Sequence, residues 1–259
     1  MSRPARIDLD ADYVIVGAGS AGAALAARLS EDPAVSVLLL EAGGPDRALE
    51  LHVPAAFSKL FRGEYDWGYD TVPQPHLEDR RIFWPRGKTL GGSSSLNAMM
   101  WVERTEDAAD ATQGTDGAQN VERQRDPRPH TAAFLRAAAE AGHPVTPANL
   151  PSGQGFTQTM VSEHRGARAS TADTYLRPAR RRRNLRVVTN AHVRRVTFAD
   201  GRATGVYVDI DSVTRQARAR REVILSGGAI GTPQLLMLSG VGPAAHLAEH
   251  GIPVVVDAP

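Results

Sequence analysis

One glycine-rich turn near the N-terminus limits what this sequence can fold into more than any other feature. The motif Gly17-Ala18-Gly19-Ser20-Ala21-Gly22 follows a β-branched run at 13–16 and opens an alanine- and leucine-rich segment at 21–30, which ends before Pro33. Residues 35–40 form a nearly continuous apolar run, which is typical of a parallel strand covered on both faces. The order of strand, glycine turn, helix and strand predicts a βαβ unit.

Each glycine of this motif has a distinct expected role. Gly17 permits the tight turn, Gly19 lets the backbone approach a pyrophosphate at the helix N-terminus, and Gly22 lets helix and strand pack closely. Glu41 follows Gly22 by 19 residues, and its carboxylate would accept hydrogen bonds from the ribose of adenosine. The alternative is a structural glycine turn beside a surface glutamate. The dinucleotide site predicted in this unit comprises Gly17, Gly19, Ser20, Ala21, Gly22, Glu41 and Ala42.

The charge balance and the absence of cysteine exclude several classes of function. Lys plus Arg number 30 and Asp plus Glu 29, so the net charge of +1 creates no field that would attract nucleic acid. The arginine run at 180–183 is interpreted as a solvated helix end before a strand that begins at Leu185. The chain has no cysteine, which excludes disulfides, thiolate catalysis and cysteine-ligated zinc and fits a cytoplasmic location.

No segment predicts membrane insertion or export. No apolar run approaches the roughly 20 residues that span a bilayer. Asp8, Asp10 and Asp12 stand where a signal peptide needs an apolar core, so we expect an untargeted N-terminus.

The middle of the chain alternates between loop-rich and regular segments. Residues 43–86 combine prolines with aromatic residues and predict loops and short helices. Residues 103–130 are almost purely polar and have no apolar periodicity, which predicts a linker. A helix is predicted over 134–141, where Gly142 and Pro144 end it.

The last third of the chain is predicted to be rich in β-strands. Residues 185–225 contain several strand-like runs, and Asp200-Gly201 is typical of a hairpin turn between two of them. A helix over 230–238 is expected to start near Thr232-Pro233. A short strand is predicted over 254–256.

Two further glycine-bearing segments decide which dinucleotide is expected, because the first motif alone does not distinguish NAD from FAD. Residues 87–97 (GKTLGGSSSLN) form a second loop that exposes its backbone, and residues 228–242 (GAIGTPQLLMLSGVG) form a third segment. Together with the first motif they resemble the glucose–methanol–choline (GMC) family of FAD-dependent oxidoreductases, and its choline dehydrogenases in particular. The resemblance covers most of 8–102 and 130–259. A flavoprotein that uses NAD(P)H would need a second GxGxxG after a strand, and the sequence has none.

This resemblance implies a fold class and its division along the chain. The fold would be α/β, a doubly wound, mainly parallel FAD-binding sheet with a β-rich addition and a remnant of the substrate domain. The FAD-binding domain would be built from 8–105 and 181–259. Residues 106–130 would be a polar linker, and 131–180 the substrate-side remnant.

The resemblance also implies further contacts with FAD. Residues 91–93 would approach the diphosphate and flavin, 97–99 would line the isoalloxazine ring, Val193 would contact the adenine, and 226–229 would close over the cofactor. In some family members a histidine just before the matching asparagine bonds to the flavin; here that position is Leu96, so non-covalent FAD is expected. The site residues added in this way are Gly87, Leu90, Gly91, Gly92, Ser93, Asn97, Ala98, Met99, Val193, Ser226 and Gly228.

The reaction that the resemblance implies is oxidation of a small-molecule alcohol by hydride transfer to flavin N5, while a base removes the hydroxyl proton. Family members are much longer, and their catalytic histidines lie beyond the position of Pro259; none of the eight histidines here matches them. Two hypotheses follow. The chain is a truncated GMC-type oxidoreductase that depends on a missing C-terminal half, or it is a catalytically inactive FAD-binding remnant of a disrupted gene. The loss of a final sheet strand would leave an apolar edge of the first strand exposed.

A rival pattern lies near the end of the chain. His246-Leu247-Ala248-Glu249-His250 has the H-x-x-E-H form of a zinc-protease helix. Such a site needs a third protein ligand, and none is evident in the sequence. Because Gly251 and Pro253 end this helix at once, the pattern is interpreted as a surface helix, and no metal site is predicted.

Overall fold

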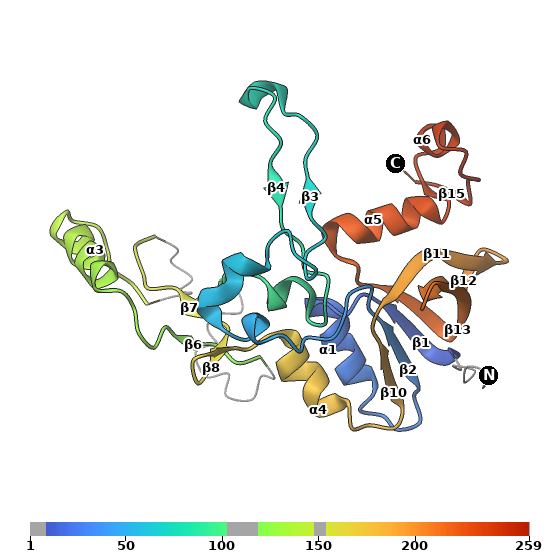
Figure 1. Ribbon diagram of the computed structural model, residues 1–259, viewed down its shortest axis with the longest axis horizontal. Helices are drawn as coiled ribbons and strands as arrows, with labels where there is room; N and C mark the ends of the chain where they lie inside the picture. Colours follow the sequence, from blue (N-terminus) through green and yellow to red (C-terminus); the bar gives the residue numbers. More distant parts are fainter. Residues whose placement is uncertain (1–8, 103–118, 148–153, 259) are drawn as a thin grey trace.

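A six-stranded sheet forms the centre of the protein in the computed structural model (Figure 1). The structure describes residues 9–102, 119–147 and 154–258. The strand order is β10-β2-β1-β13-β12-β11. The bounds of these strands are β1 (Ala11–Val16), β2 (Val37–Leu40), β10 (Leu185–Val188), β11 (Ala191–Ala199), β12 (Arg202–Ile210) and β13 (Val213–Leu225).

Four strands of this sheet run parallel. β1 pairs with both β2 and β13, and β2 pairs with β10. Side chains of β1 and β2 alternate between two apolar cores, so that Val14 and Leu38 enter one core while Ile15 and Leu39 enter the other. Both faces are therefore buried, which explains why these strands are apolar without alternation.

Different elements cover the two faces. On one face, α1 (Ser20–Leu29) packs through small alanine side chains, together with η5 (Ala172–Leu176) and α4 (Arg177–Ala179). The antiparallel strands β11 and β12, the first part of β13, and Leu235 of α5 (Gly228–Leu238) build the other core. The arrangement is an α/β fold with a mainly parallel sheet and a β-rich addition.

The first strand does not have the exposed edge that the resemblance implied. Residues 219–225 of β13 pair in parallel with β1, and β2 occupies the other side. β13 can do this because it is 13 residues long: its first part pairs antiparallel with β12 and its second part continues beside β1. Instead, residues 219–225 have no partner on their outer side among the described strands.

Two local predictions had opposite outcomes. Asp200 and Gly201 connect β11 to β12 with φ values of 51° and 74°, as a two-residue type I′ hairpin requires, which confirms that turn. The predicted helix start at Thr232-Pro233 is wrong, because α5 begins at Gly228 and contains Pro233. Pro233 lies close to the helix N-terminus, where its missing N–H removes only one intrahelical bond.

Residues 43–86 form short helices, as expected, and a hairpin that was not predicted. The helices are η1 (Leu49–Leu51), η2 (Pro54–Leu60) and η3 (Pro75–Leu77). The hairpin consists of β3 (Tyr69–Asp70) and β4 (Phe83–Trp84), which project from the body of the molecule (Figure 1). These strands are too short to produce a periodic sequence pattern.

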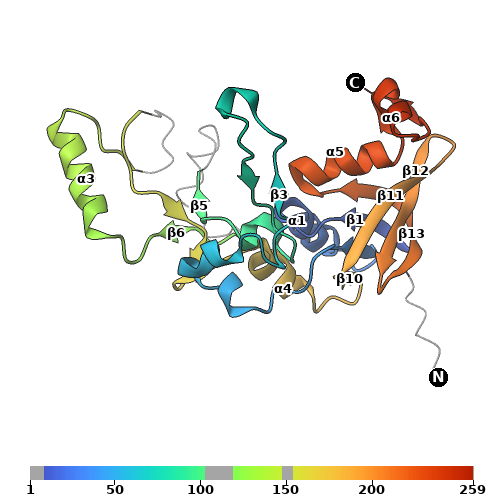
Figure 2. The same ribbon diagram turned by 45° about the horizontal axis from the view of Figure 1, so that its top comes forward.

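A smaller region lies beside the central sheet. It contains the three-stranded sheet β5-β7-β6 and the hairpin of β8 and β9. The helix α3 stands farthest from the central sheet (Figure 2). Of the expected linker, 106–118 lies outside the described residues, while Glu122 and Arg123 form a strand. The bounds are β5 (Met100–Trp101), β6 (Glu122–Arg123), α3 (Pro129–Glu140), β7 (Met160–Val161), β8 (Glu163–His164) and β9 (Ala167–Arg168).

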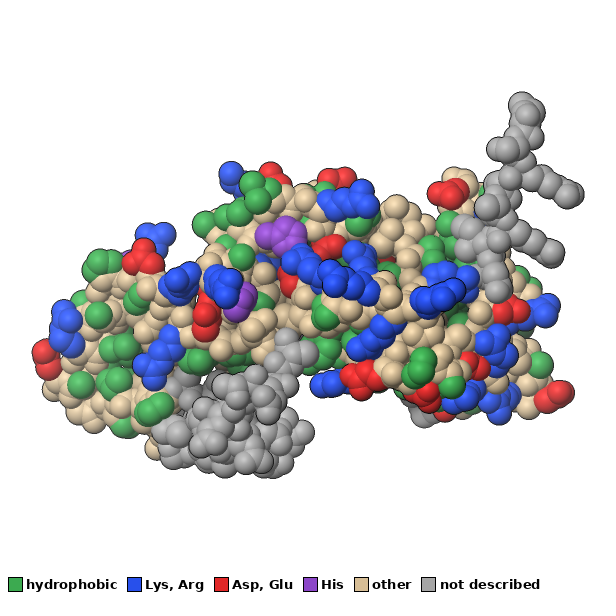
Figure 3. Space-filling view, turned by 90° about the horizontal axis from the view of Figure 1, so that it is seen from below, with side chains coloured by type: hydrophobic (Ala, Val, Ile, Leu, Met, Phe, Trp, Pro, Cys, Tyr) green, Lys and Arg blue, Asp and Glu red, His purple; other side chains and the backbone are tan. Residues whose placement is uncertain are grey.

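The arginine run at 180–183 is only partly the solvated helix end that was expected. The Arg182 guanidinium donates to the Ala27 carbonyl and, at 2.9 Å, to Ser30 Oγ, so it holds the C-terminal end of α1. Arg180, Arg181 and Arg183 are exposed. Figure 3 shows basic side chains spread along the face seen from below rather than gathered in one patch.

The H-x-x-E-H pattern does form a helix, α6 (Ala244–Glu249), between the paired strands β14 (Val241–Gly242) and β15 (Val256–Asp257). The His246 and His250 rings lie 4.8 Å apart between centroids. Among the described residues, no group of three histidine or carboxylate side chains is placed to hold a metal ion. Within the same residues, no helix has the length and apolar character that crossing a bilayer requires.

Candidate cofactor-binding site

A cavity of about 500 Å³ opens where three parallel strands end. Val16, Leu40 and Leu225 are the last residues of β1, β2 and β13, and all three line it. Ligands of open α/β sheets bind outside the carboxyl ends of the strands, so this is the expected place for a cofactor. The predicted site residues that line the cavity are Gly17, Gly19, Ser20, Ala21, Glu41, Ala42, Gly87, Gly92, Ser93, Val193, Ser226 and Gly228.

The two N-proximal glycine loops are in direct contact. Gly91 N–H donates to the Ala18 carbonyl at 2.8 Å. At Gly92, where φ is +53°, a Cβ would lie 2.7 Å from Gly19 Cα. Gly17, with φ of +94°, makes the first turn, and a Cβ there would lie 2.5 Å from the Ser226 carbonyl oxygen. Side chains at Gly17 and Gly92 would therefore force apart the three glycine-bearing segments.

The N-terminus of α1 is directed at this cavity without a capping side chain. Gly19 is the N-cap residue and has no side chain, and Ser20 and Ala21 of the first turn line the cavity. The first N–H groups of a helix have no intrahelical partner and carry the positive end of the helix dipole. Such an end can bind a phosphate through its backbone.

Glu41 connects the end of β2 to the first glycine loop. Its side chain is buried, and its two oxygens accept hydrogen bonds from Ala18 N–H at 2.8 Å and Gly43 N–H at 2.9 Å. Burial raises the pKa of the Glu41 carboxyl, although the two N–H donors and Lys88 act in the opposite direction. Each carboxyl oxygen has a second lone pair. The carboxylate is thus fixed in orientation and can still accept a hydroxyl.

Six predicted residues do not line the cavity. Gly22 lies behind it, where a Cβ would meet the Gly17 carbonyl oxygen at 1.9 Å. Leu90 and Gly91 are buried in the second loop. Asn97 and Ala98 are exposed, whereas Met99 is buried. Leu96 is buried in a separate apolar cluster with Leu51 and Leu60.

An aromatic wall of the cavity was not found in the sequence. Trp67 and Tyr69 stack with 5.9 Å between ring centroids, and the His192 ring meets Trp67 edge-on at 5.8 Å. Lys88 Nζ lies 4.8 Å from the centre of the Trp67 ring. Burial and the nearby cations Arg194 and Lys88 lower the pKa of His192. Trp67 precedes β3, and Gly68 between the two rings has φ of +67°, so strand alternation does not account for their stacking and the sequence carried no clear signal for it.

Comparison with known proteins agrees with this geometry. The family model described as GMC oxidoreductase matches residues 11–123 and 103–255. The chain belongs to the GMC oxidoreductase family. The two matched ranges overlap at residues 103–123, which belong to the polar stretch between the second glycine motif and the rest of the chain.

Curated relatives match this chain along nearly its whole length. An uncharacterized GMC-type oxidoreductase of Mycobacterium tuberculosis is 49% identical, over 98% of this chain and 54% of its own length. An oxygen-dependent choline dehydrogenase of Brucella melitensis is 39% identical, over 97% of this chain and 51% of its own length. The chain therefore spans about half the length of the curated relatives it matches.

Solved structures lead to the same family. Pyridoxine 4-oxidase from Mesorbium loti superposes with a TM-score of 0.91 at 32% identity, over 96% of this chain and 55% of the other. A formate oxidase variant from Aspergillus oryzae, studied for FAD modification, has a TM-score of 0.88 at 28% identity, over 98% of this chain and 52% of the other. GMC oxidoreductases are FAD-dependent flavoproteins, and this chain has their fold.

Proposed function

We propose that this chain forms the FAD-binding part of an oxidoreductase that oxidises a small-molecule alcohol, and that FAD binds in the cavity without a covalent bond. The observation that carries the proposal is the convergence of three distant glycine segments and Glu41 on one cavity at the ends of parallel strands. The residues present fit the cofactor: an uncapped helix end faces the cavity, and a buried carboxylate stands beside it.

Each part of the cavity has a proposed role in holding FAD. The pyrophosphate would lie at the N-terminus of α1, where Gly19 leaves the backbone accessible. Glu41 would accept the ribose hydroxyls, and the main chain at Val193 and the Trp67 ring would contact the adenine. Gly92 and Ser93 of the second loop line the cavity, and the isoalloxazine ring would lie along this loop in the direction of Met99. Residues 226–229 would close the third side.

The chemistry that FAD supplies when bound is acceptance of a hydride from the alcohol carbon at N5. This chain's residues bind and orient the cofactor and exclude water from one side of it. A base must also take the hydroxyl proton. We propose that this base comes from a C-terminal half such as the longer relatives contain, because no histidine here matches the family's catalytic positions.

The proposal includes a division of the chain into domains. Residues 8–105 and 181–259 would form the FAD-binding domain, 106–130 would be a polar linker, and 131–180 would be the substrate-side remnant. A cytoplasmic location, expected from the absence of cysteine, belongs to the same proposal. The second candidate function is an inactive FAD-binding remnant, which is favoured because none of the eight histidines of this sequence matches the family's catalytic positions.

Titration of the purified chain with FAD tests the binding proposal. FAD fluorescence should be quenched on binding, FMN should bind at least tenfold more weakly because it lacks the adenosine half, and ADP should compete. Glu41→Gln should weaken FAD binding at least tenfold, whereas Glu31→Gln, an exposed glutamate paired with Arg28, should not. No FAD binding, or equal affinity in the Glu41→Gln variant, would refute the proposal.

Anaerobic addition of an alcohol panel separates the two candidate functions. If the chain needs a C-terminal half, FAD in this chain should keep its visible absorbance with every alcohol. Bleaching in the chain alone would refute both the dependence on that half and the inactive remnant. Bleaching that appears only when the corresponding half of a relative is added would refute the remnant alone.

A further inference from the structure

Arg168 is a buried arginine with unusual hydrogen bonding. It ends β9 and is only 3% exposed. Its Nη1 donates to the Ser94 carbonyl at 3.1 Å and to Asn97 Oδ1 at 2.9 Å. Its Nε and Nη2 are buried and have no hydrogen-bond partner among the described residues. A buried cation without full pairing lowers the stability of the fold. The presence of arginine at this position therefore indicates a role that a neutral side chain could not fill.

Two carboxylates act against the effect of burial on Arg168. Burial lowers the pKa of Arg168 to about 10, while Asp173 and Glu163 act against that shift. The guanidinium therefore stays protonated at neutral pH. Because only Nη1 is hydrogen-bonded, the interactions that depend on this side chain are those to Ser94 and Asn97.

Asn97 passes this constraint to the backbone. Asn97 Oδ1 accepts from Arg168 and also from Met99 N–H at 3.0 Å. Met99 has φ of +60°, a conformation that non-glycine residues rarely adopt without support. The Met99 carbonyl in turn accepts from Ser162 N–H at 2.9 Å. The turn from Asn97 to Met99 is thus held at both ends by residues far away in the sequence.

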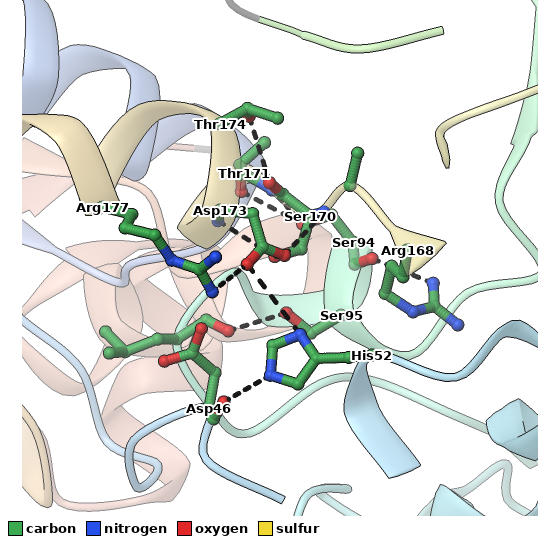
Figure 4. A network of polar contacts seen from close by, with 12 residues as sticks. Asp46, His52, Ser94, Ser95, Arg168, Ser170, Thr171, Asp173, Thr174 and Arg177 are labelled. Atoms are coloured by element: carbon green, nitrogen blue, oxygen red, sulfur yellow. Dashed lines mark hydrogen bonds and ion pairs between the residues drawn. The ribbon is translucent and has the colours of Figure 1, made fainter. Parts of the chain in front are cut away.

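A second set of contacts holds the loop at Ser94, three residues before this turn. Ser94 Oγ accepts from Thr171 N–H at 3.1 Å and lies 3.0 Å from Thr171 Oγ1. Figure 4 shows Ser94 between Arg168 on one side and Thr171 on the other. Ser170 and Asp173 belong to the same network, since Ser170 Oγ donates to Asp173 Oδ2 at 2.7 Å. Residues 162–173 therefore clamp the far end of the second glycine loop.

We propose that Arg168 is a positioning residue of the flavin site: by binding Asn97 and the Ser94 carbonyl, it fixes the turn at Met99, which ends the loop along which the isoalloxazine ring would lie. The placement of the ring rests on the proposed function, whereas the control of the turn rests on the hydrogen bonds alone. Arg168 does not touch the cavity, so it acts through Asn97. The segment that carries Arg168 is thereby coupled to flavin geometry.

Hydrogen exchange of the peptide that contains Met99 tests the turn without any cofactor. Arg168→Met should speed exchange of the Met99 amide at least tenfold. Arg168→Lys, which keeps the positive charge and N–H donors but loses the planar guanidinium, should have an intermediate effect. Asn97→Ala removes the acceptor of the Met99 amide itself, so it should speed exchange at least as much as Arg168→Met, and the double variant should exchange no faster than Asn97→Ala alone. Arg182→Met is the matched control, because Arg182 holds the end of α1 and should change only the unfolding midpoint.

Flavin circular dichroism tests the link to the cofactor. With FAD bound, Arg168→Met should reduce the induced visible band and weaken affinity about tenfold, while Arg182→Met should leave both unchanged. Native Met99 exchange in Arg168→Met, or additive effects of the Arg168 and Asn97 changes, would overturn the positioning role. If the native chain fails to bind FAD while Arg168→Met still speeds Met99 exchange, the proposed function falls and the control of the turn stands.

Discussion

Replacing Gly19 by alanine should separate cofactor binding from folding. Gly19 has φ of −75° and ψ of −162°, which alanine adopts without strain. A Cβ there would meet only Gly92 Cα, at 3.8 Å, an ordinary van der Waals distance. The methyl group would nevertheless stand between the two glycine loops, beside the helix N-terminus that is proposed to bind the pyrophosphate.

The effect of Gly19→Ala on stability is expected to be small because two terms oppose each other. Alanine is a poorer N-cap than glycine by about 0.5–1 kcal/mol. Alanine also lowers the entropy of the unfolded chain, which stabilises by about 0.4–1 kcal/mol where the backbone is compatible. The free energy of unfolding should therefore change by less than about 0.5 kcal/mol, whereas FAD affinity should fall at least tenfold, or about 1.4 kcal/mol.

Two measurements on the same samples check this separation. Urea unfolding followed by tryptophan fluorescence reports stability, and FAD fluorescence quenching reports affinity. Gly63→Ala is the control, because Gly63 is exposed, lies outside the cavity and has open space for a Cβ apart from the Leu60 carbonyl at 3.5 Å. Native FAD affinity in Gly19→Ala would refute the placement of the pyrophosphate. A loss of stability well above about 0.5 kcal/mol would contradict the expectation that alanine fits at position 19 without strain.

Three further predictions concern the stability of the second glycine loop, the acid sensitivity of the fold and the linkage of the flavin. Gly92→Ala should lower the free energy of unfolding by more than about 2 kcal/mol in urea titrations, because it combines a positive φ with a Cβ 2.7 Å from Gly19 Cα; a native midpoint would contradict this. Ser36 and then Arg220 lower the pKa of Asp12, so this carboxylate should stabilise the fold above about pH 4 and lose that effect as the pH falls; Asp12→Asn should flatten the acid side of the stability profile, and an unchanged slope would count against it. Acid precipitation of the FAD-loaded chain should release all the flavin into the supernatant, and yellow protein pellets would contradict non-covalent binding.

The βαβ unit and the β-rich addition could be predicted from the sequence because their signals are local. The glycine turn, the apolar run before Glu41 and the Asp200-Gly201 pair each specify a backbone conformation within a few residues. The turn between β12 and β13 carried no such signal, since Asp211 and Ser212 adopt positive φ without a glycine. Likewise, the course of β13 could not be predicted, because its change of partner depends on which strands are already in place.

The candidate site was predictable to the extent that its residues occur in motifs. Gly19, Glu41 and Gly92 were found in this way and line one cavity. Trp67 and His192 reach the cavity from a hairpin and a strand that are far apart in the sequence, and only tertiary packing brings their rings together. Arg168 is a similar case, since its two partners lie more than 70 residues before it. Long-range contacts of single residues leave no local pattern for sequence reasoning to detect.

α5, which lines the cavity proposed to bind FAD, is only partly covered by the described residues. α5 is apolar around its circumference, yet among its residues only Leu235 is buried, and Leu238 is 49% exposed. A helix of that composition is normally covered on all sides. The outer edge of 219–225, which leads directly into α5, also lacks a partner among the described strands. Because the relatives are about twice as long, we expect their additional residues to cover this edge and helix.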